Sequence, residues 1–395
     1  MNCLLRDFVQ RGEVEIKTGP FGTQLKASEY VEQGTPVLNV KNLGYSTVVK
    51  SKLDQVGPST IERLSMHILH CGDIVFGRKG AVDRHAYISG EEEGWMQGSD
   101  CIRVRVKTEK INSRYLSYYF LTPEHRTFMI SMCSHGTTMA SLNQKILEMI
   151  EVPLPDRSVQ DGIVSLLRML DDKVELNQKI NQNLQQQAFI LFDRFLSVEH
   201  SSKCPLSRIA MINPKRILKK GKYARYIDMA QLSTSGSFPN GWESKPYNGG
   251  MRFSNGDTLL ARITPCLENG KTAYIDFLGE NEVAFGSTEY VVISSRGEYP
   301  PEFFYCLARC PSFVDYAVKN MNGSSGRQRV SAETIGNYLL PALTEGELQE
   351  FRSTVPCLFK MIRNNAIESM VLTQLRDSLL PRLISGEIDV SNIKC

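Results

Sequence analysis

The amino-acid sequence predicts a mixed α/β (α+β) protein in which two similar globular domains are separated by two long helices. These helices are expected to form an antiparallel coiled coil, so that the whole chain is a pseudo-two-fold internal repeat. Three observations predict this fold class. At 395 residues the chain is longer than one ordinary domain. Its sequence repeats once over a long distance, and an uninterrupted stretch without Gly or Pro occupies residues 166–196.

The repeat sets the expected domain boundaries. GDIVFGRKGAVDRHAYI, from Gly72, returns as GDTLLARITPCLENGKTAYI, from Gly256, and HGTTMASLNQKILEMIEVPLP, from His135, is echoed by NGSSGRQRVSAETIGNYLLPA, from Asn322. One tandem duplication explains both echoes, and a short-period solenoid does not. The expected order is a first globular domain over 1–155, a helix over 156–200, a second globular domain over 201–342, and a second helix with a tail over 343–395.

Each globular domain is expected to combine short strands with helices. PVLNVKNL, GDIVFGRKG, HAYI and DCIRVRVK are bounded by Gly and Asp turns and predict strands in the first domain. NSRYLSYYFLTPEHRTFMISM predicts a helix, and PPEFFYCLARCPSFVDYAV predicts its equivalent in the second domain. These elements predict a mixed α/β arrangement in each domain.

The two long segments carry matched heptad seams. Apolar residues recur at alternating spacings of three and four, and a polar patch interrupts both seams at the same place. A single stripe usually packs on its own domain, but two matched stripes favour helices that pack on each other. We expect Asn181 to lie near Asn365, and Asn177 near Ser369. The residues expected to pair the helices are Leu170, Val174, Asn177, Asn181, Leu184, Leu358, Ile362, Asn365, Ser369 and Leu372.

Composition excludes several classes. The formal net charge of +3 is mild, and the proportions of hydrophobic and charged residues are those of a globular protein. Charged residues occur too near the start of the chain for the apolar core of a signal peptide, and no apolar run is as long as a membrane span. We therefore expect a cytoplasmic protein without a membrane partner. The ten scattered cysteines favour reduced thiols. Cys306 and Cys310 have no second pair at metal-binding spacing, so no metal site is expected.

Several segments resemble one known family. IKTGPFGTQLKASEY, GDIVFGRKGAV, TTMASLNQKILEMIEVPLP, SVQDGIV and the ending LLPRLISGEIDV are similar to the specificity (S) subunit of type I restriction–modification systems. The resemblance covers the whole chain, although the second domain departs more, with ARITPCLENGK where the first has GRKGAVDR. It implies a DNA-binding, non-catalytic subunit whose two target recognition domains each read one half of a split, asymmetric site on double-stranded DNA.

The resemblance also implies partners. The helices would space the domains and dock two methyltransferase (M) subunits, and restriction/translocase (R) subunits would join them. No cofactor is expected on this chain, and S-adenosylmethionine and ATP are expected on the partner subunits.

Cationic, hydroxyl and amide side chains on matching loops are the candidate DNA contacts. Arg and Lys can contact phosphate or guanine, and Asn can pair with adenine. Singly each is more often a solvated surface residue, but the clusters match between the two domains. In the first domain they are Lys17, Thr18, Lys26, Lys41, Asn42, Arg78, Lys79, Arg84, His85, Thr137, Thr138, Ser141 and Asn143. In the second they are Arg252, Arg262, Lys271, Ser324, Ser325, Arg327, Gln328 and Arg329. The most basic window, 203–225, suits a solvated linker and a phosphate-binding segment equally well.

No catalytic motif is found in the sequence. PCLENGKT has Pro265 where a phosphate-binding loop needs its first Gly, and no Gly-rich turn for S-adenosylmethionine or nucleophile–base pair is present. Two alternatives stay open. The chain could be the DNA-recognition part of a restriction–methylation enzyme whose catalysis lies on another chain or fragment, against which the ending GEIDV argues. It could also be a coiled-coil scaffold without a DNA role.

Overall fold

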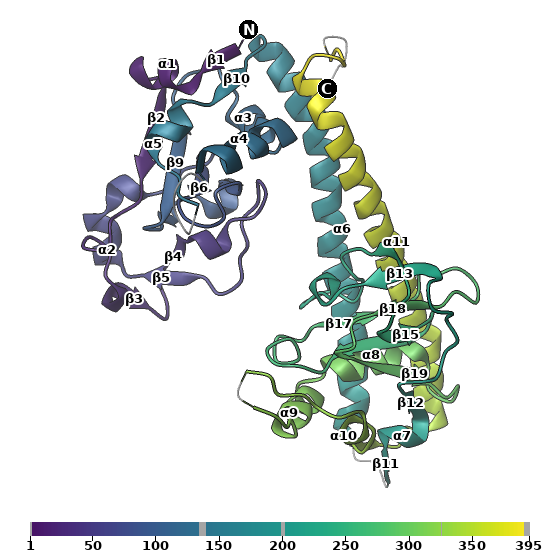
Figure 1. Ribbon diagram of the computed structural model, residues 1–395. Helices are drawn as coiled ribbons and strands as arrows, with labels where there is room; N and C mark the ends of the chain where they lie inside the picture. The colour runs from purple at the N-terminus through teal and green to yellow at the C-terminus, as the bar shows by residue number, and fades with distance from the viewer. Residues whose placement is uncertain (1, 134–139, 199–201, 325, 391–395) are drawn as a thin grey trace. The chain divides into compact units, whose positions relative to one another are not determined.

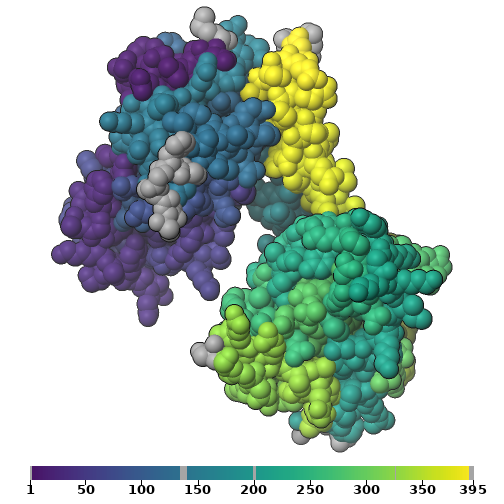
Figure 2. Space-filling model, in the orientation of Figure 1, coloured from purple at the N-terminus to yellow at the C-terminus, as the bar shows by residue number. Residues whose placement is uncertain are grey.

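The structure, a computed structural model, describes residues 2–133, 140–198, 202–324 and 326–390. It divides into two compact units, and Figure 2 shows that the atoms within each unit are densely packed. The first unit contains the residues up to Asp172 together with those from Thr373 onward, and the second is Lys173–Leu372. Two long helices, α6 (Arg157–Ser197) and α11 (Glu345–Ile384), belong partly to each unit (Figure 1).

The first unit is a mixed α/β body. Its strands are β1 (Asn2–Leu4), β2 (Val14–Thr18), β3 (Tyr30–Val31), β4 (Thr35–Leu38), β5 (Asp54–Val56), β6 (Ile74–Gly77), β7 (His85–Tyr87), β8 (Met96–Gln97), β9 (Cys101–Val106) and β10 (Glu151–Pro153). Its shorter helices are α1 (Leu5–Gln10), α2 (Pro58–Arg63), α3 (Ser113–Tyr119), α4 (Pro123–Cys133) and α5 (Gln144–Glu148).

The second unit repeats this composition. Its strands are β11 (Lys203–Pro205), β12 (Ala210–Ile212), β13 (Tyr223–Ile227), β14 (Glu243–Pro246), β15 (Met251–Phe253), β16 (Asp257–Ala261), β17 (Thr272–Tyr274), β18 (Ala284–Gly286), β19 (Tyr290–Ser295) and β20 (Leu339–Pro341). Its shorter helices are α7 (Leu206–Ile209), α8 (Pro301–Arg309), α9 (Pro311–Lys319) and α10 (Ala332–Gly336).

The two units share the topology of their larger sheet and part of that of the smaller one. An antiparallel sheet has the order β2-β9-β6-β7 in the first unit and β12-β19-β16-β17 in the second. In the smaller sheets β5-β4-β8 corresponds to β14-β13-β18, each with one antiparallel and one parallel pair, whereas β3 is added beside β5 in the first unit and β15 beside β18 in the second. The pairs β1–β10 and β11–β20 join the beginning of each domain to its end. The duplication expected from the sequence is therefore a duplication of structure.

Each large sheet packs one face on helices. In the first unit Phe76 on β6 contacts Phe120, which directly follows α3, with ring centroids 5.0 Å apart, and both are fully buried. In the second unit Phe303 and Phe304 on α8 belong to the core that also buries Leu260 on β16. Burial of these apolar side chains is the main force that holds the helices on the sheets.

The expected helix of each domain is divided in two. α3 ends at Tyr119 and α4 begins at Pro123, and α8 ends at Arg309 before α9 begins at Pro311. Proline lacks a backbone N–H and clashes with the preceding turn, so it occupies the first turn of a new helix rather than the interior of a long one. The single helices predicted from the sequence were wrong in this respect.

The long helices pair within each unit in antiparallel order. In the second unit Asn365 Nδ2 donates to Asn181 Oδ1 at 2.9 Å, and Asn177 Nδ2 lies 3.3 Å from Ser369 Oγ. This is the pairing expected from the matched polar patches. In the first unit Asp171 on α6 accepts a hydrogen bond from Arg376 on α11 at 2.8 Å. Leu184 and Ile362 are buried, whereas the other apolar seam residues, Leu170, Val174, Leu358 and Leu372, are half-buried.

Candidate nucleic-acid interface

The loop between β6 and β7 is fixed at three points in the first unit. Arg78 N donates to Asp100 O at 2.7 Å, and Leu142 N donates to Arg78 O at 2.8 Å. Gly80 N donates to Ala140 O at 3.0 Å. These backbone bonds tie the loop to the segments that precede β9 and α5. The side chains at the loop tip are therefore presented from a fixed backbone.

The loop between β16 and β17 has the same bonds in the second unit. Arg262 N donates to Glu289 O at 3.0 Å, and Val330 N donates to Arg262 O at 3.0 Å. Thr264 N donates to Gln328 O at 3.1 Å. The segments involved again precede the long strand, β19, and a short helix, α10. The two loops are structural equivalents, although their side chains differ.

The short helices beside the loops begin with equivalent caps. Asn143 Oδ1 accepts from Ile146 N at 3.0 Å at the start of α5, and Ser331 Oγ accepts from Thr334 N at 2.9 Å at the start of α10. Such caps satisfy the free N–H groups of the first turn. Asn143, a predicted DNA contact, thus also has a structural role.

The predicted DNA contacts differ in how far their side chains are exposed to solvent. Those with exposed side chains are Lys26, Lys41, Lys79, Arg84, Ser141, Asn143, Ser324 and Arg327. Those that are half-buried are Lys17, Thr18, Arg78, Arg252, Arg262, Lys271, Gln328 and Arg329. Thr137, Thr138 and Ser325 lie outside the described residues.

Two predicted contacts are wrong because their side chains are inside the fold. Asn42 is 0% exposed and donates to Val49 O and Ser51 O. His85 is also 0% exposed, and its Nε2 lies 2.9 Å from Ser117 Oγ. Burial lowers the pKa of His85 to about 3, so this ring is neutral at physiological pH. Neither side chain can reach DNA in this structure.

The predicted cations form clusters around the two loops. Arg78 lies over the ring of Phe21, with 5.6 Å from Cζ to the ring centroid, and Lys79 is 3.6 Å from Asp100. In the second unit Arg329 forms a bidentate pair with Glu289, whose pKa it lowers through these hydrogen bonds. Arg329 therefore fixes the loop, while the exposed Arg327 beside it is accessible to a ligand.

Other predicted residues lie away from the loops or are occupied. Lys41 pairs with Asp54 at 2.7 Å on the small sheet, and Lys271 Nζ donates to Met229 O at 2.8 Å. Arg252 lies on β15 of the other small sheet. The loop clusters are the part of the prediction that the structure brings together.

Aromatic side chains near the first loop were missed by sequence reasoning. Phe21 is 55% exposed, and Tyr45 is 41% exposed. Arg84 and Arg126 lie over the Tyr45 ring at 5.4 and 4.7 Å. The available signal was an aromatic residue in a Gly-rich turn, as in GPFG. Cations and exposed rings beside rigid loops can contact phosphates and sugar or base faces.

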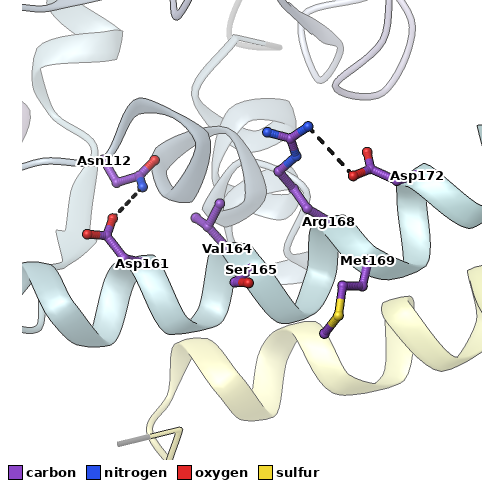
Figure 3. Close-up of a pocket in the computed structure, with 7 residues that line it drawn as sticks. All are labelled: Asn112, Asp161, Val164, Ser165, Arg168, Met169 and Asp172. Atoms are coloured by element: carbon purple, nitrogen blue, oxygen red, sulfur yellow. Dashed lines mark hydrogen bonds and ion pairs between the residues drawn. The ribbon is translucent and has the colours of Figure 1, made fainter. Parts of the chain in front are cut away.

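A pocket of about 360 Å³ in the first unit has a different character (Figure 3). Asn112 Nδ2 donates to Asp161 Oδ1 at 2.6 Å, and Arg168 pairs with Asp172 at 3.6 Å. The lining residues are Asn112, Asp161, Val164, Ser165, Arg168, Met169 and Asp172. Two carboxylates against one guanidinium disfavour a polyanion, so this pocket is not part of the interface.

No group of His, Cys, Asp and Glu side chains suited to hold a metal ion is present among the described residues. Within the same part of the chain, no helix has the length and apolar character needed to span a membrane.

A duplicated α/β fold with paired helices and a rigid cationic loop in each repeat defines the class of this protein, and comparison with known proteins shows which of them it is similar to. Residues 14–186 match the type I restriction modification DNA specificity domain. The specificity subunit of the type I restriction enzyme HindI from Haemophilus influenzae is 20% identical over 398 residues, which cover 80% of this chain and 86% of that protein. The MjaIX specificity subunit from Methanocaldococcus jannaschii is 24% identical over 404 residues, covering 93% and 90%.

The fold comparison agrees. The crystal structure of the S subunit of a type I restriction–modification system from M. genitalium superposes with a TM-score of 0.55 at 14% identity, covering 97% of this chain and 95% of that one. Residues 14–186 thus match the type I DNA specificity domain, and most of the chain is similar in sequence to specificity subunits of type I restriction enzymes.

Proposed function

We propose that this chain is the DNA sequence-recognition subunit of a type I restriction–modification complex. One observation carries the proposal: the loops that begin at Arg78 and Arg262 occupy the same place in the two repeats, with the same backbone bonds and different side chains. Equivalent position suits two domains that read DNA in the same way. Different side chains suit two different half-sites, so the recognised site is split and asymmetric.

The division of labour within the complex follows from the chemistry of the chain. This subunit supplies recognition without catalysis, as its similarity to specificity subunits supports, and the described residues of its candidate interface include cations, amides and aromatic rings. Two methyltransferase subunits dock on α6 and α11, and restriction/translocase subunits complete the complex. S-adenosylmethionine and ATP act on those partners.

A domain exchange tests this function. The β1–β10 pairing closes the first domain between Asn2 and Pro153, so residues 1–155 form a natural unit to replace with the first domain of a relative. We expect methylation-aware sequencing of a host carrying the chimera and its methyltransferase to show one new half-site and one unchanged half-site. The matched control exchanges residues 202–342 and changes the other half.

Two results would contradict the proposal. Simultaneous change of both half-sites would mean that the domains do not read independently. Absence of DNA binding by the complex of this chain with its methyltransferase, in a mobility-shift assay, would favour the scaffold alternative.

A further inference from the structure

The basic window before β13 contains a built turn rather than a linker. Lys222 N donates to Lys219 O at 3.1 Å, and Gly221 has a φ of +82°. A positive φ at the third residue is typical of a type II turn, and Gly adopts it without steric cost. Gly221 N donates to Tyr247 O at 2.8 Å, and Tyr247 N donates to Lys222 O at 2.9 Å. The turn therefore extends the β13–β14 hairpin with a fixed backbone.

No acidic side chain among the described residues pairs with the three lysines of this turn. Lys219, Lys220 and Lys222 are exposed, and none of them forms an ion pair with any residue in the described ranges. Two other cations of the same sheet are paired: Arg225 lies 3.3 Å from Glu282, and Lys245 lies 2.8 Å from Glu243. Three uncompensated charges within four residues repel one another, and a polyanion would relieve that repulsion.

Exposed apolar side chains accompany the lysines. Tyr223, the first residue of β13, is 69% exposed, and Ile217, in the preceding segment, is 89% exposed. On the outer face of the small sheet Lys245 lies over the Tyr226 ring at 4.6 Å, and Arg252 lies over Tyr247 at 5.9 Å. Because successive side chains of a strand alternate between its faces, Tyr223 lies on the face opposite to Tyr226 and Lys245. The lysines of the turn and the exposed Tyr223 beside them suit a nucleic-acid backbone, because sugars offer apolar contact between phosphates.

The first domain lacks this feature. Its β4 occupies the place of β13, since each pairs with one antiparallel and one parallel neighbour. The four residues before β4, Val31–Gly34, contain Glu32 and no lysine, whereas the four residues before β13 contain three lysines. The fold shared by the domains therefore does not require the lysine turn.

The turn lies at the start of β13, and the end of β13 lies near the candidate loop between β16 and β17, which belongs to the larger sheet and whose Lys271 contacts Met229. Ile227 at the end of β13 is paired with Gly286 at the end of β18, and Glu289 of the loop cluster follows shortly after. Tyr223, next to the turn, is four residues from Ile227, or about 13 Å along the strand. That length corresponds to about four base pairs along a DNA strand at about 3.4 Å each.

We propose that the Lys219–Lys222 turn, with Tyr223 beside it, binds phosphates of the duplex that flanks the second half-site. The contact is independent of base sequence and has no counterpart in the first domain. This inference rests on the proposed function, because it assigns the polyanion to the DNA whose half-site the second domain reads.

Salt dependence of binding tests the inference. The full chain in complex with its methyltransferase subunits is titrated with duplexes that carry the host motif or a scrambled motif, at several salt concentrations. The variant is Lys219→Gln with Lys220→Gln, and the matched control is Lys203→Gln with Lys319→Gln, two exposed lysines of the same unit. Each phosphate contact contributes about 0.9 to the slope of log K against log salt.

We expect the turn variant to reduce that slope by about 2 and to weaken both duplexes by a similar factor, with the methylated motif unchanged. The control should bind as the unmodified complex does. Shortening the flank next to the second half-site should reduce the slope of the unmodified complex more than that of the variant, which retains only Lys222 of the three lysines.

Three results would overturn the inference. They are an unchanged slope in the turn variant, an equal loss in the control, and a loss of methyltransferase assembly at normal DNA affinity, which would make the turn a protein-docking surface. Failure of the unmodified complex to bind DNA at all is a different outcome, because it removes the proposed function itself.

Discussion

Replacing Asn181 and Asn365, the amide pair between the long helices, should show that their contributions to the free energy of unfolding are strongly coupled. Asn365 Nδ2 donates to Asn181 Oδ1 at 2.9 Å, and Asn181 Nδ2 donates to Ile362 O at 3.2 Å. Asn181→Leu removes both bonds and leaves the Asn365 amide without its acceptor in a half-buried seam. The lost bond and the unpaired group together cost about 1–2 kcal/mol. Asn365→Leu should cost a similar amount.

The double variant should behave differently. With both residues changed to Leu no amide is left unpaired, and two apolar side chains meet in the seam. Half-burial of each Leu contributes about 0.5–1 kcal/mol, so the pair should be more stable than the original by about 1 kcal/mol. The resulting coupling energy is about 3–5 kcal/mol, at or above the upper end for residues in direct contact. Asn177, which still reaches Ser369, should keep the helices in register.

Hydrogen exchange measures this locally. The opening free energy of backbone amides in residues 173–190 and 355–369 reports the helix pair without requiring the whole chain to unfold in one step. Lys360→Ala on an exposed position of α11 serves as a control that should be additive with Asn181→Leu. Additive effects of the two Leu replacements, or a single replacement that stabilises the helix pair, would contradict the claim that the Asn181–Asn365 hydrogen bond couples the two residues.

Two further predictions concern buried titratable groups. Burial lowers the pKa of His125 to about 3, below its usual 6.5, so this residue contributes stability above pH 6.5 that is lost as pH falls toward 3. His125→Phe should therefore raise the melting temperature of the first unit at pH 5 much more than at pH 8, and an equal shift at both would contradict this assignment. Burial raises the pKa of Asp276 from 3.8 to about 7, so its stabilising contribution is present below pH 3.8 and is lost as pH rises through 7. Asp276→Asn should stabilise the second unit at pH 8 by up to about 4 kcal/mol and have little effect at pH 4, as followed by denaturant unfolding; a pH-independent effect would show that the carboxyl does not titrate in this range.

Much of the architecture could be predicted from sequence because it depends on local periodicity and repetition. The alternating spacing from Leu170 to Leu184 predicts a helical seam, since 3.6 residues per turn bring such positions to one face. Shifting the pattern along the repeat correctly brings Asn181 to Asn365, because duplicated segments in antiparallel pairing meet at equivalent positions. The helix breaks are also encoded locally, at Pro123 and Pro311, but apolar periodicity by itself predicts one continuous helix across each proline.

The candidate interface depended on tertiary structure. His85 and Asn42 look like surface polar residues in sequence, but one lies in the core below α3 and the other satisfies loop carbonyls. Arg329 is occupied by Glu289, forty residues earlier in the chain, so its charge is not available in the way that a basic cluster suggests.

The basic window, 203–225, also separates what the sequence shows from what the tertiary structure shows. Its charges are evident in the sequence, which supports a linker and a phosphate-binding segment equally. The proposal that this segment binds phosphate depends on Tyr247, whose backbone holds the Lys219–Lys222 turn from a position twenty-five residues after Lys222. The sequence by itself determined the duplicated elements and the helix pairing, because hydrophobic period and repetition act over neighbouring turns. Only the tertiary structure decided which polar side chains face solvent, because their partners come from strands and loops that are distant in the chain.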